Sequence, residues 1–263
     1  MTEQNVLVVD IGNTAVVLGL WTGDKLAASW RVAALRERTA DEYGTLFRQL
    51  LGDRGSDISG AIAGSVVPPL NSTIAETFDR YFGVRALFVE PGVRTGLSIH
   101  TENPLEVGAD RIANAVAAHH ELHATTIVVD FGTATTFDLV SEKGEYRGGI
   151  IAPGLEISAE ALFTRAARLP RVDIRRPTHL IGANTVASMQ SGIFYGYVGL
   201  VDGILERMKA EVPDAKAVIA TGSTGALLAD ESRHIQRFDP ELTMKGLKLI
   251  YDRNQAPRKG GRR

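Results

Sequence analysis

Two stretches of the chain show the same pattern of apolar and polar positions. Val6–Val9 and Ile127–Val129 are short apolar runs, and each is followed by an aspartate, one hydrophobic residue and a glycine. After a few small or polar residues, a second run rich in β-branched residues begins. Short apolar runs that end at Asp and Gly are typical of buried strands joined by tight turns. We therefore predict two copies of one strand–turn–strand unit, about half a chain apart.

Elsewhere the apolar spacing alternates between that of strands and that of helices. In 41–51, for example, Tyr43, Leu46, Phe47 and Leu50 recur at intervals of three and four. The same reasoning predicts helices at 41–51, from Pro68-Pro69 toward Tyr81, at 110–120, after Gly154 and at about 186–211, and strands at 16–20, 26–31, 61–65, 86–89, 146–151 and 217–220. Strands that alternate with helices favour a mixed α/β fold.

The chain divides into two predicted domains and a tail. We expect an N-terminal domain at 1–119, a C-terminal domain at 120–251, and a basic, disordered tail at 252–263. Residues 92–104 are rich in turn formers and are predicted to be a loop.

Composition narrows the class of protein. The 263 residues are 44% hydrophobic and 23% charged, which is ordinary for a globular chain with a sizeable core. The net charge of −2 makes nucleic acid an unfavoured main partner. Without cysteine, the chain has no disulfide, thiolate metal site or thiol nucleophile. We find neither a signal peptide nor an apolar run long enough for a membrane span, so we expect a cytoplasmic protein that does not bind membranes.

The chemistry of the repeated turns points to phosphate. Asp10 and Asp130 each end an apolar strand beside a glycine, whose bare backbone N–H groups can surround an oxyanion. A single turn of this kind is often only an Asp-Gly turn, and the pair could be duplicated scaffold. However, a carboxylate at the end of a buried strand is costly unless a cation balances it. Two copies favour two similar halves that face one another across a polyphosphate.

Four other segments combine turn residues with polar chemistry, and each has a purely structural alternative. In Gly108–Arg111, the aspartate is either a helix-capping or first-turn acid or a general base, and the arginine is either a surface cation or an anion anchor. Gly148–Gly154 is a hairpin edge before a helix, or a place where backbone approaches a ligand. Gly182–Thr185 supplies a helix cap. Thr221–Gly225 is a strand-to-helix turn that could lie flat against a planar ring.

Taken together, these segments resemble a known family. Asp10–Thr14, Gly108–Arg111, Asp130–Ala134 and Gly148–Gly154 are similar in order and spacing to the motifs of type III pantothenate kinases, and the resemblance covers about residues 6–230. It implies two ribonuclease-H-like α/β domains related by duplication, as in the acetate and sugar kinase, Hsp70 and actin superfamily, with ATP in the cleft between them. It also implies phosphorylation of pantothenate to 4′-phosphopantothenate, the entry to coenzyme A, by a homodimer whose substrate site lies near the interface.

The resemblance also implies roles for individual residues. Asp10 would face Mg²⁺, mainly through water, and Asp130 would hold a monovalent cation, K⁺ or NH₄⁺. Asp110 would be the catalytic proton acceptor. The implied ATP-binding residues are Asp10, Ile11, Gly12, Asn13, Thr14, Ala15, Val16, Val17 and Thr133. The implied substrate-binding residues are Thr101, Gly108, Ala109, Asp110, Arg111 and Thr185.

Two positions depart from the family pattern, and two other functions remain as alternatives. Thr101 stands where many members have a tyrosine, with His100 beside it as a candidate replacement, and Ser223 stands where a second glycine is common. One alternative is a non-catalytic, ATP-binding regulatory protein of the same fold that assists transcription. The other is a hydrolase or chaperone-like ATPase, although the chain is too short for the substrate-binding domain and lid of an Hsp70. Phosphoryl transfer that depends on pantothenate would separate the kinase from both.

Overall fold

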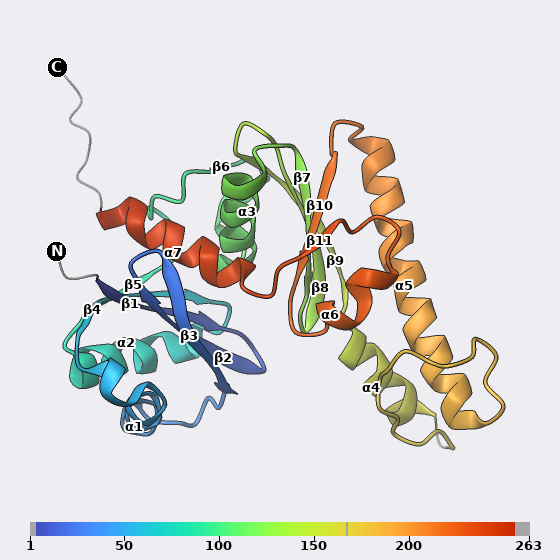
Figure 1. The fold of residues 1–263 in the computed structure, drawn as a ribbon, viewed down its shortest axis with the longest axis horizontal. Coiled ribbons are helices and arrows are strands. Elements are labelled where there is room, and N and C mark those ends of the chain that lie inside the picture. Colours follow the sequence, from blue (N-terminus) through green and yellow to red (C-terminus); the bar gives the residue numbers. More distant parts are fainter. Residues whose placement is uncertain (1–3, 167, 256–263) are drawn as a thin grey trace. The chain divides into compact units, whose positions relative to one another are not determined.

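The structure of the chain, a computed structural model, describes residues 4–166 and 168–255. It forms two compact units (Figure 1). The first unit contains the chain up to Leu97, Glu102–Ala117 and the chain from Leu242, and the second contains Ser98–Thr101 and Ala118–Glu241. Among the described residues, no helix is both long and apolar enough to cross a membrane.

The sheet of the first unit has five strands in the order β3-β2-β1-β4-β5. Their bounds are β1 (Asn5–Ile11), β2 (Ala15–Thr22), β3 (Lys25–Ala33), β4 (Ile58–Ser65) and β5 (Ala86–Phe88). β1, β2 and β3 form an antiparallel meander, whereas β1, β4 and β5 run parallel. The predicted strand–turn–strand unit at the start of the chain is therefore confirmed.

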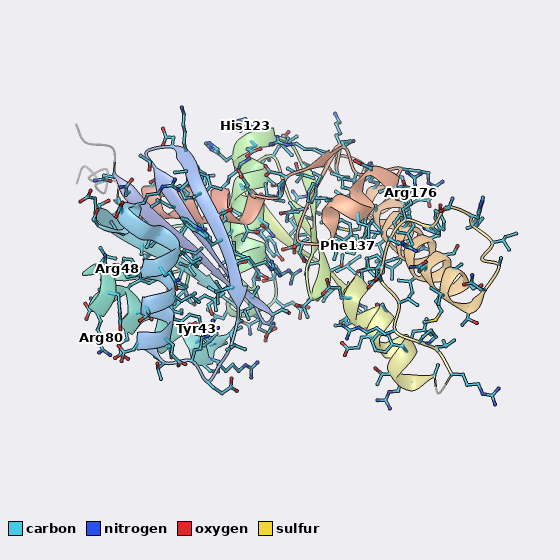
Figure 2. The ribbon with its side chains drawn as sticks, turned by 60° about the horizontal axis from the view of Figure 1, so that its bottom comes forward. Tyr43, Arg48, Arg80, His123, Phe137 and Arg176 are labelled. Carbon is cyan, nitrogen blue, oxygen red and sulfur yellow. The ribbon has the colours of Figure 1, made fainter. Side chains whose placement is uncertain are left out.

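Helices cover both faces of this sheet. α1 (Ala40–Leu51) and α2 (Pro68–Phe82) lie on one face, and α7 (Leu242–Gln255) contacts β1 and β4 from the other (Figure 1). The short 3₁₀ segment η1 (Gly52–Gly55) follows α1. Tyr43, labelled in Figure 2, is fully buried in the core beneath α1 and α2. The core also contains aromatic and aliphatic side chains of α1, α2 and the sheet, and their burial is the main force that stabilises the unit.

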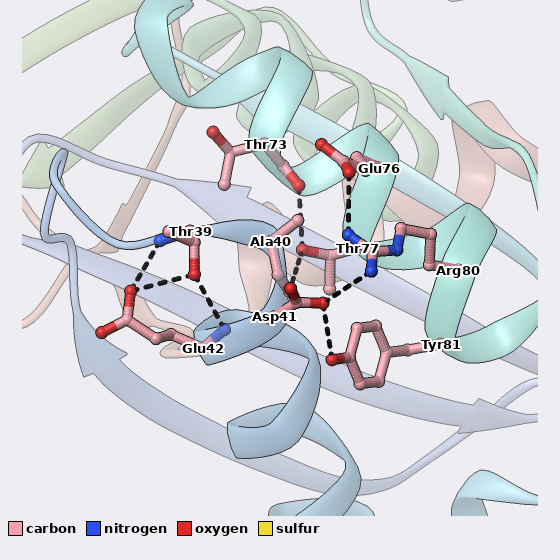
Figure 3. A network of polar contacts seen from close by, with 9 residues as sticks. All are labelled: Thr39, Ala40, Asp41, Glu42, Thr73, Glu76, Thr77, Arg80 and Tyr81. Carbon is pink, nitrogen blue, oxygen red and sulfur yellow. Dashed lines mark hydrogen bonds and ion pairs between the residues drawn. The ribbon is translucent and has the colours of Figure 1, made fainter.

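The ends of α1 and α2 are joined by a polar network (Figure 3). Thr39 and Glu42 form a reciprocal capping box at the start of α1. Asp41 accepts a hydrogen bond from the Tyr81 hydroxyl at 2.8 Å and pairs with Arg80 at 3.1 Å. These contacts orient the two helices, and none of the candidate site residues takes part in them.

The second unit repeats the strand pairing of the first. Its sheet has the order β11-β10-β7-β8-β9-β6. The bounds are β6 (Ser98–Ile99), β7 (Thr126–Phe131), β8 (Ala134–Val140), β9 (Glu145–Pro153), β10 (Ala217–Thr221) and β11 (Arg237–Phe238). β7, β8 and β9 form an antiparallel meander, and β7, β10 and β11 run parallel. The two sheets thus share one topology, as expected of a duplication, and β6 is an added strand within the segment predicted to be a loop.

One face of the second sheet is covered by α5 (Thr185–Glu211), the longest helix among the described residues. The other helices of this unit are α4 (Leu155–Arg165) and α6 (Gly225–Leu228), with the 3₁₀ segment η3 (Ala229–Glu231) after α6. Phe137 of β8, labelled in Figure 2, is fully buried in the core formed with Phe194 and Val201 of α5.

Two helices, α3 (Ala109–Leu122) and α7, do not follow the predicted domain boundaries. The 3₁₀ segment η2 (Pro104–Glu106) leads into α3, which passes from the first unit to the second after Ala117. α7 packs in the first unit, although the sequence suggested that 120–251 is one C-terminal domain. The reason is that Leu247 and Ile250 are fully buried there, where α7 contacts β1 and β4.

The predicted tail also starts too early. Residues 252–255 are the last turn of α7 and are not an irregular end. The remainder of the predicted tail, 256–263, lies outside the described residues.

Candidate active site

The first turn presents backbone groups beside a carboxylate. Asp10 is half-buried in β1, one residue before the strand ends. The Gly12 amide donates to the Ala15 carbonyl at 2.9 Å and closes the turn, while Asn13 and Thr14 are exposed at its tip. The turn therefore combines a fixed negative charge with accessible polar groups, an arrangement suited to a phosphate and its cation.

The start of α3 lies at the same end of the first sheet as Asp10. Asp10 is paired with Gly64 of β4, so both positions share one face of the sheet. A Cβ atom on Gly64 would lie 3.7 Å from the Cβ of Ala109 and 2.9 Å from Leu247. Glycine at 64 thus allows α3 and α7 to pack closely over the ends of β1 and β4. The structure brings the first turn and the Gly108–Arg111 segment together within one unit.

The carboxyl group of Asp110 is held at the beginning of α3. Its Oδ1 accepts a hydrogen bond from the Arg111 amide at 2.8 Å, and the residue is half-buried. A Cβ atom on Gly108 would lie only 2.5 Å from the same oxygen, so a side chain there would displace the carboxyl group. Negative charge is stabilised in the first turn of a helix. The segment therefore fixes an acidic group that can accept a proton.

The second turn also places an aspartate one residue before the end of its first strand, but its loop is one residue shorter than that of the first turn. The Gly132 amide donates to the Ala134 carbonyl at 3.2 Å, and Thr133 is exposed at the tip. Asp130 is half-buried in β7 and is paired with Thr221 of β10. The glycine after Thr221 has a φ of +96°, and a Cβ atom on it would lie 2.6 Å from Oδ1 of Asp130. The turn that follows β10 therefore lies directly against the Asp130 carboxylate.

A third turn supports the second from the other side. The Gly154 amide donates to the Thr133 carbonyl at 3.1 Å. A Cβ atom on Gly154 would lie 2.2 Å from that carbonyl oxygen and 2.5 Å from that of Gly132, so no larger residue fits without a shift of the backbone. The glycine in the Pro153-Gly154 motif thus allows the backbone at the end of β9 to lie close to the second turn.

Thr101 and His100 differ in their surroundings. The Thr101 hydroxyl is buried without a hydrogen-bond partner, and its methyl group lies 3.7 Å from the position of a Cβ atom on Gly148. A buried hydroxyl without a partner costs free energy that a ligand atom could recover. His100 is exposed, and its amide donates to the Tyr146 carbonyl in the sheet. Thr101 is therefore the better placed of the two to contact a ligand.

Thr185 lies away from the second turn. It is the exposed first residue of α5, and its neighbour Asn184 caps the helix by accepting from the Ala187 amide at 2.9 Å. Tyr197, which contacts the strand after the second turn, lies twelve residues further along α5, roughly 18 Å at the rise of an α-helix. The structure does not bring Thr185 and Thr133 together.

The oxygen donors of the two turns suit hard cations. Each turn carries a half-buried carboxylate, Asp10 or Asp130, and an exposed threonine at its tip, Thr14 or Thr133, and hard cations such as Mg²⁺ prefer oxygen ligands. Within the described part of the chain, no group of three or more His, Asp or Glu residues is arranged to hold a metal ion.

Sequence reasoning did not identify two polar features near Asp130. Asp138 is buried and accepts hydrogen bonds from the Tyr146 hydroxyl at 2.5 Å and from the Thr136 hydroxyl at 3.0 Å. The Tyr197 hydroxyl contacts Thr135. The polar residues at alternate positions 136 and 138 of an otherwise buried strand are a signal for the first feature, because they predict one polar face. We find no such signal in the sequence for Tyr197.

Comparison with protein families gives one result over most of the chain. The family described as Type III pantothenate kinase matches residues 6–207. A Type III pantothenate kinase of Geobacter sulfurreducens is 55% identical over 252 residues, which are 95% of this chain and 99% of the relative. A Type III pantothenate kinase of Myxococcus xanthus is 54% identical, with the same coverage of both chains.

Comparison with solved structures agrees at the level of the fold. A Campylobacter jejuni protein described as a Baf family transcriptional activator has a TM-score of 0.59 at 22% identity, and the match covers 94% of this chain and 98% of that one. A ROK family glucokinase from Streptomyces griseus, solved with glucose and AMPPNP, has a TM-score of 0.57 at 12% identity, with coverage of 96% and 100%. At these identities the likeness shows the fold alone.

Proposed function

The chain belongs to the type III pantothenate kinase family, and from that premise we propose how its two turns and the start of α3 phosphorylate pantothenate. ATP is the phosphoryl donor, and the reaction supplies 4′-phosphopantothenate for coenzyme A biosynthesis. The observation that carries the proposal is the position of α3. Its first turn lies over the ends of β1 and β4, on the face of the sheet that carries Asp10.

Asp110 is the proton acceptor in this mechanism. A bond forms between the primary hydroxyl oxygen of pantothenate and the γ-phosphorus of ATP, and the bond from that phosphorus to the β–γ bridging oxygen breaks to release ADP. The hydroxyl proton passes to the Asp110 carboxylate. The transition state of phosphoryl transfer is loose, so the protein acts mainly by positioning the reactants and by neutralising charge. The contacts that fix Asp110 support this role.

Other residues bind and orient the two substrates. The guanidinium of Arg111 offers paired donors for the carboxylate or neighbouring oxygens of pantothenate. Thr101, with its buried hydroxyl, and Thr185 are further substrate contacts in the proposal. The first turn, Asp10 to Val17, and Thr133 bind the phosphates of ATP.

We assign different cations to the two turns. Asp10 would hold Mg²⁺, the divalent ion that accompanies ATP, mainly through water. Asp130 would hold a monovalent cation, K⁺ or NH₄⁺, as the family resemblance implies, and the glycine turn after β10 lies close to its carboxylate. When bound, these ions neutralise phosphate oxygens.

A homodimer is the assembly we propose, with the substrate site near its interface. Among the described residues, seven of nine exposed large hydrophobic side chains fall between residues 150 and 186, and Ile181 is 87% exposed. The Ser188 hydroxyl donates to the Gly182 carbonyl at 3.2 Å and holds this loop against α5. Such a concentration of apolar surface is typical of protein–protein contacts. Use of ATP favours a cytoplasmic location, which also remains part of the proposal.

An assay coupled to ADP release tests the reaction. We expect ADP release to require pantothenate, ATP and Mg²⁺, and to fall when K⁺ is replaced by Na⁺ at constant ionic strength.

Asp130→Asn should weaken ATP binding and flatten the response to K⁺, whereas Asp10→Asn should alter the response to Mg²⁺ and keep the shape of the K⁺ response. ADP release that does not depend on pantothenate would contradict the kinase mechanism and favour a plain ATPase. No turnover despite ATP binding would favour the non-catalytic regulatory alternative.

A further inference from the structure

Tyr197 in the middle of α5 uses its hydroxyl group on two different strands. The residue is 4% exposed. Its Oη donates to the Pro153 carbonyl at 2.9 Å, and lies 2.5 Å from Oγ1 of Thr135. Because the tyrosine proton is used on Pro153, the Thr135 hydroxyl is the donor of the second bond. A chain of two hydrogen bonds therefore runs from β8 through α5 to β9.

Both ends of this chain lie beside the second turn. Thr135 comes two residues after Thr133, and the last pair of the β8–β9 ladder is Ala134 with Pro153. The residue after Pro153 donates its amide to the Thr133 carbonyl. The Tyr197 hydroxyl thus joins the two strand ends between which the tip of the turn is held.

We infer that the Tyr197 hydroxyl is a positioning group that holds the turn at Asp130–Ala134 in the shape that binds the nucleotide and the monovalent cation. This inference rests on the proposed function, which places ATP phosphates at Thr133 and the cation at Asp130. Without the hydroxyl, the Pro153 carbonyl and the Thr135 hydroxyl both lose a partner, and the closely packed Thr133–Gly154 contact loses its support. The groups that meet the ligand then have to be ordered when it binds, which lowers affinity.

The hydroxyl acts as a hydrogen-bond group and not as an acid. Burial raises the pKa of Tyr197 above its ordinary value, and the hydrogen bond from Thr135 offsets only part of that rise. The side chain is therefore neutral at physiological pH and does not exchange protons with substrate.

Tyr197→Phe removes the hydroxyl and keeps the ring, and Tyr43→Phe is a matched control. Tyr43 is also fully buried, and its hydroxyl also makes two hydrogen bonds, with the Leu35 amide and carbonyl at 3.1 Å each. Tyr43 lies in the first unit, on α1, and takes no part in the proposed site. Both variants should lower the melting temperature to a similar extent.

Only the Tyr197 variant should change ligand binding. Tyr197→Phe removes both hydrogen bonds, and a loss of binding free energy equal to that of one of them corresponds to roughly a five- to tenfold change in affinity. We expect Tyr197→Phe to raise the ATP KM by about that factor and to shift K⁺ activation to higher concentration, with kcat at saturating ATP and the pantothenate KM within about twofold of wild type. Calorimetric titration of a non-hydrolysable ATP analogue, with and without K⁺, should show the same loss of affinity without turnover. Thr135→Val should reproduce these changes, and the double variant should add little.

Two outcomes would overturn the inference. One is an ATP KM and K⁺ response of Tyr197→Phe that match those of Tyr43→Phe, since the hydroxyl would then be only structural. The other is full additivity of Tyr197→Phe and Thr135→Val. Failure of the proposed function has a different signature, because the wild-type protein itself would then show no K⁺ response and Thr133→Val would leave ATP binding unchanged.

Discussion

Two aspartates of the chain, Asp110 and Asp202, lie in different surroundings. Asp110 is half-buried at the start of α3, where it accepts from the Arg111 amide and remains accessible to ligand. Asp202 is buried in α5, where it accepts from the Ser232 hydroxyl at 2.6 Å and from the amide and Nε of Arg233. We propose that the first takes up a proton, whereas the second joins α5 to the segment after η3.

Asp110→Asn should retain nucleotide binding and lose turnover. The amide keeps the shape of the side chain but cannot accept the hydroxyl proton, and loss of a general base costs about 10²–10⁴ in rate. Steady-state kcat and calorimetric affinity for an ATP analogue measure the two effects separately. Asp79→Asn, at an exposed position of α2, is the control. A kcat of Asp110→Asn within threefold of wild type would contradict the role.

Asp202→Asn should lower stability in a way that depends on pH. Burial raises the pKa of Asp202, but the hydrogen bonds from Ser232 and Arg233 outweigh it and hold the pKa below the ordinary value. The ionised carboxylate therefore stabilises the folded state above the pKa of an unfolded aspartate, and this contribution is lost as the pH falls through the lower folded pKa. We expect a loss of about 2 kcal/mol in the free energy of unfolding at pH 7.

Urea denaturation at several pH values measures this effect. The difference between wild type and Asp202→Asn should be constant near neutral pH and should shrink in acid, below the ordinary range of an aspartate. A difference that stays the same down to pH 3 would show that the charge of Asp202 is not what stabilises the contact.

At the scale of residues, the sequence could propose only those groups whose chemistry depends on local spacing. Asp10, Asp110 and Asp130 each stand next to a glycine or a helix start, and this spacing is visible in the sequence. Tyr197 could not be found in this way, because its partners are 44 and 62 residues away along the chain. Its importance follows only from tertiary packing.

At the scale of elements, helices α3 and α7 of the first unit pack closely because α7 has a glycine where they cross. A Cβ atom on Gly246 would lie 1.8 Å from the Ala113 carbonyl oxygen, and the neighbouring Thr243 hydroxyl donates to Asn114 Oδ1 at 2.7 Å. Because the obstructing atoms are backbone, α7 would have to move away from α3 to admit a methyl group.

Gly246→Ala should therefore destabilise the first unit, by about 1–3 kcal/mol. Gly196→Ala is the matched control, since this glycine is also inside a helix but nothing lies within 4 Å of an added methyl group. The control should gain up to about 1 kcal/mol from the higher helix propensity of alanine. Thermal melts followed by circular dichroism compare the two, and equal melting temperatures would show that the crossing tolerates the methyl group.

Strands and helices were predicted well where local pattern determines them. The two hairpins and the helices α1, α2, α3 and α5 agree with the spacing of their apolar residues. α7 was not predicted, because its buried face includes Lys248 and Gly246 among the apolar residues. The buried lysine pairs with Asp252 at 2.7 Å, an i,i+4 contact that the apolar pattern does not reveal.

At the scale of the whole molecule, the duplication was visible in the sequence but the exchange of helices between units was not. Both sheets have the same pairing around β1 and β7, as the repeated Asp-Gly turns predicted. Membership of α7 in the first unit depends on which surface it buries. That choice is made by long-range packing, for which the chain offers no local signal.

Ile181→Glu should test the proposed dimer. A charge at this exposed apolar position should be costly in an interface but harmless on a free surface, so sedimentation should shift from dimer to monomer and activity should fall. Leu35→Glu, at a 43% exposed leucine of the first unit, is the control and should remain dimeric. A wild-type protein that sediments as a monomer, or an Ile181→Glu variant that stays dimeric and active, would contradict the proposal for this face.

The place of α7 has a consequence for how the chain matures on the ribosome. The strands of the first sheet leave the ribosome early, but Leu247 and Tyr251, which cover Gly64 and Gly60 of β4, are made only after the whole of Ala118–Glu241. During that interval the face of the first sheet that α7 covers is exposed to solvent, and exposed apolar surface promotes aggregation. The nascent N-terminal half is therefore expected to depend on chaperones until translation passes Tyr251, and a premature stop before α7 should damage the first unit more than the second.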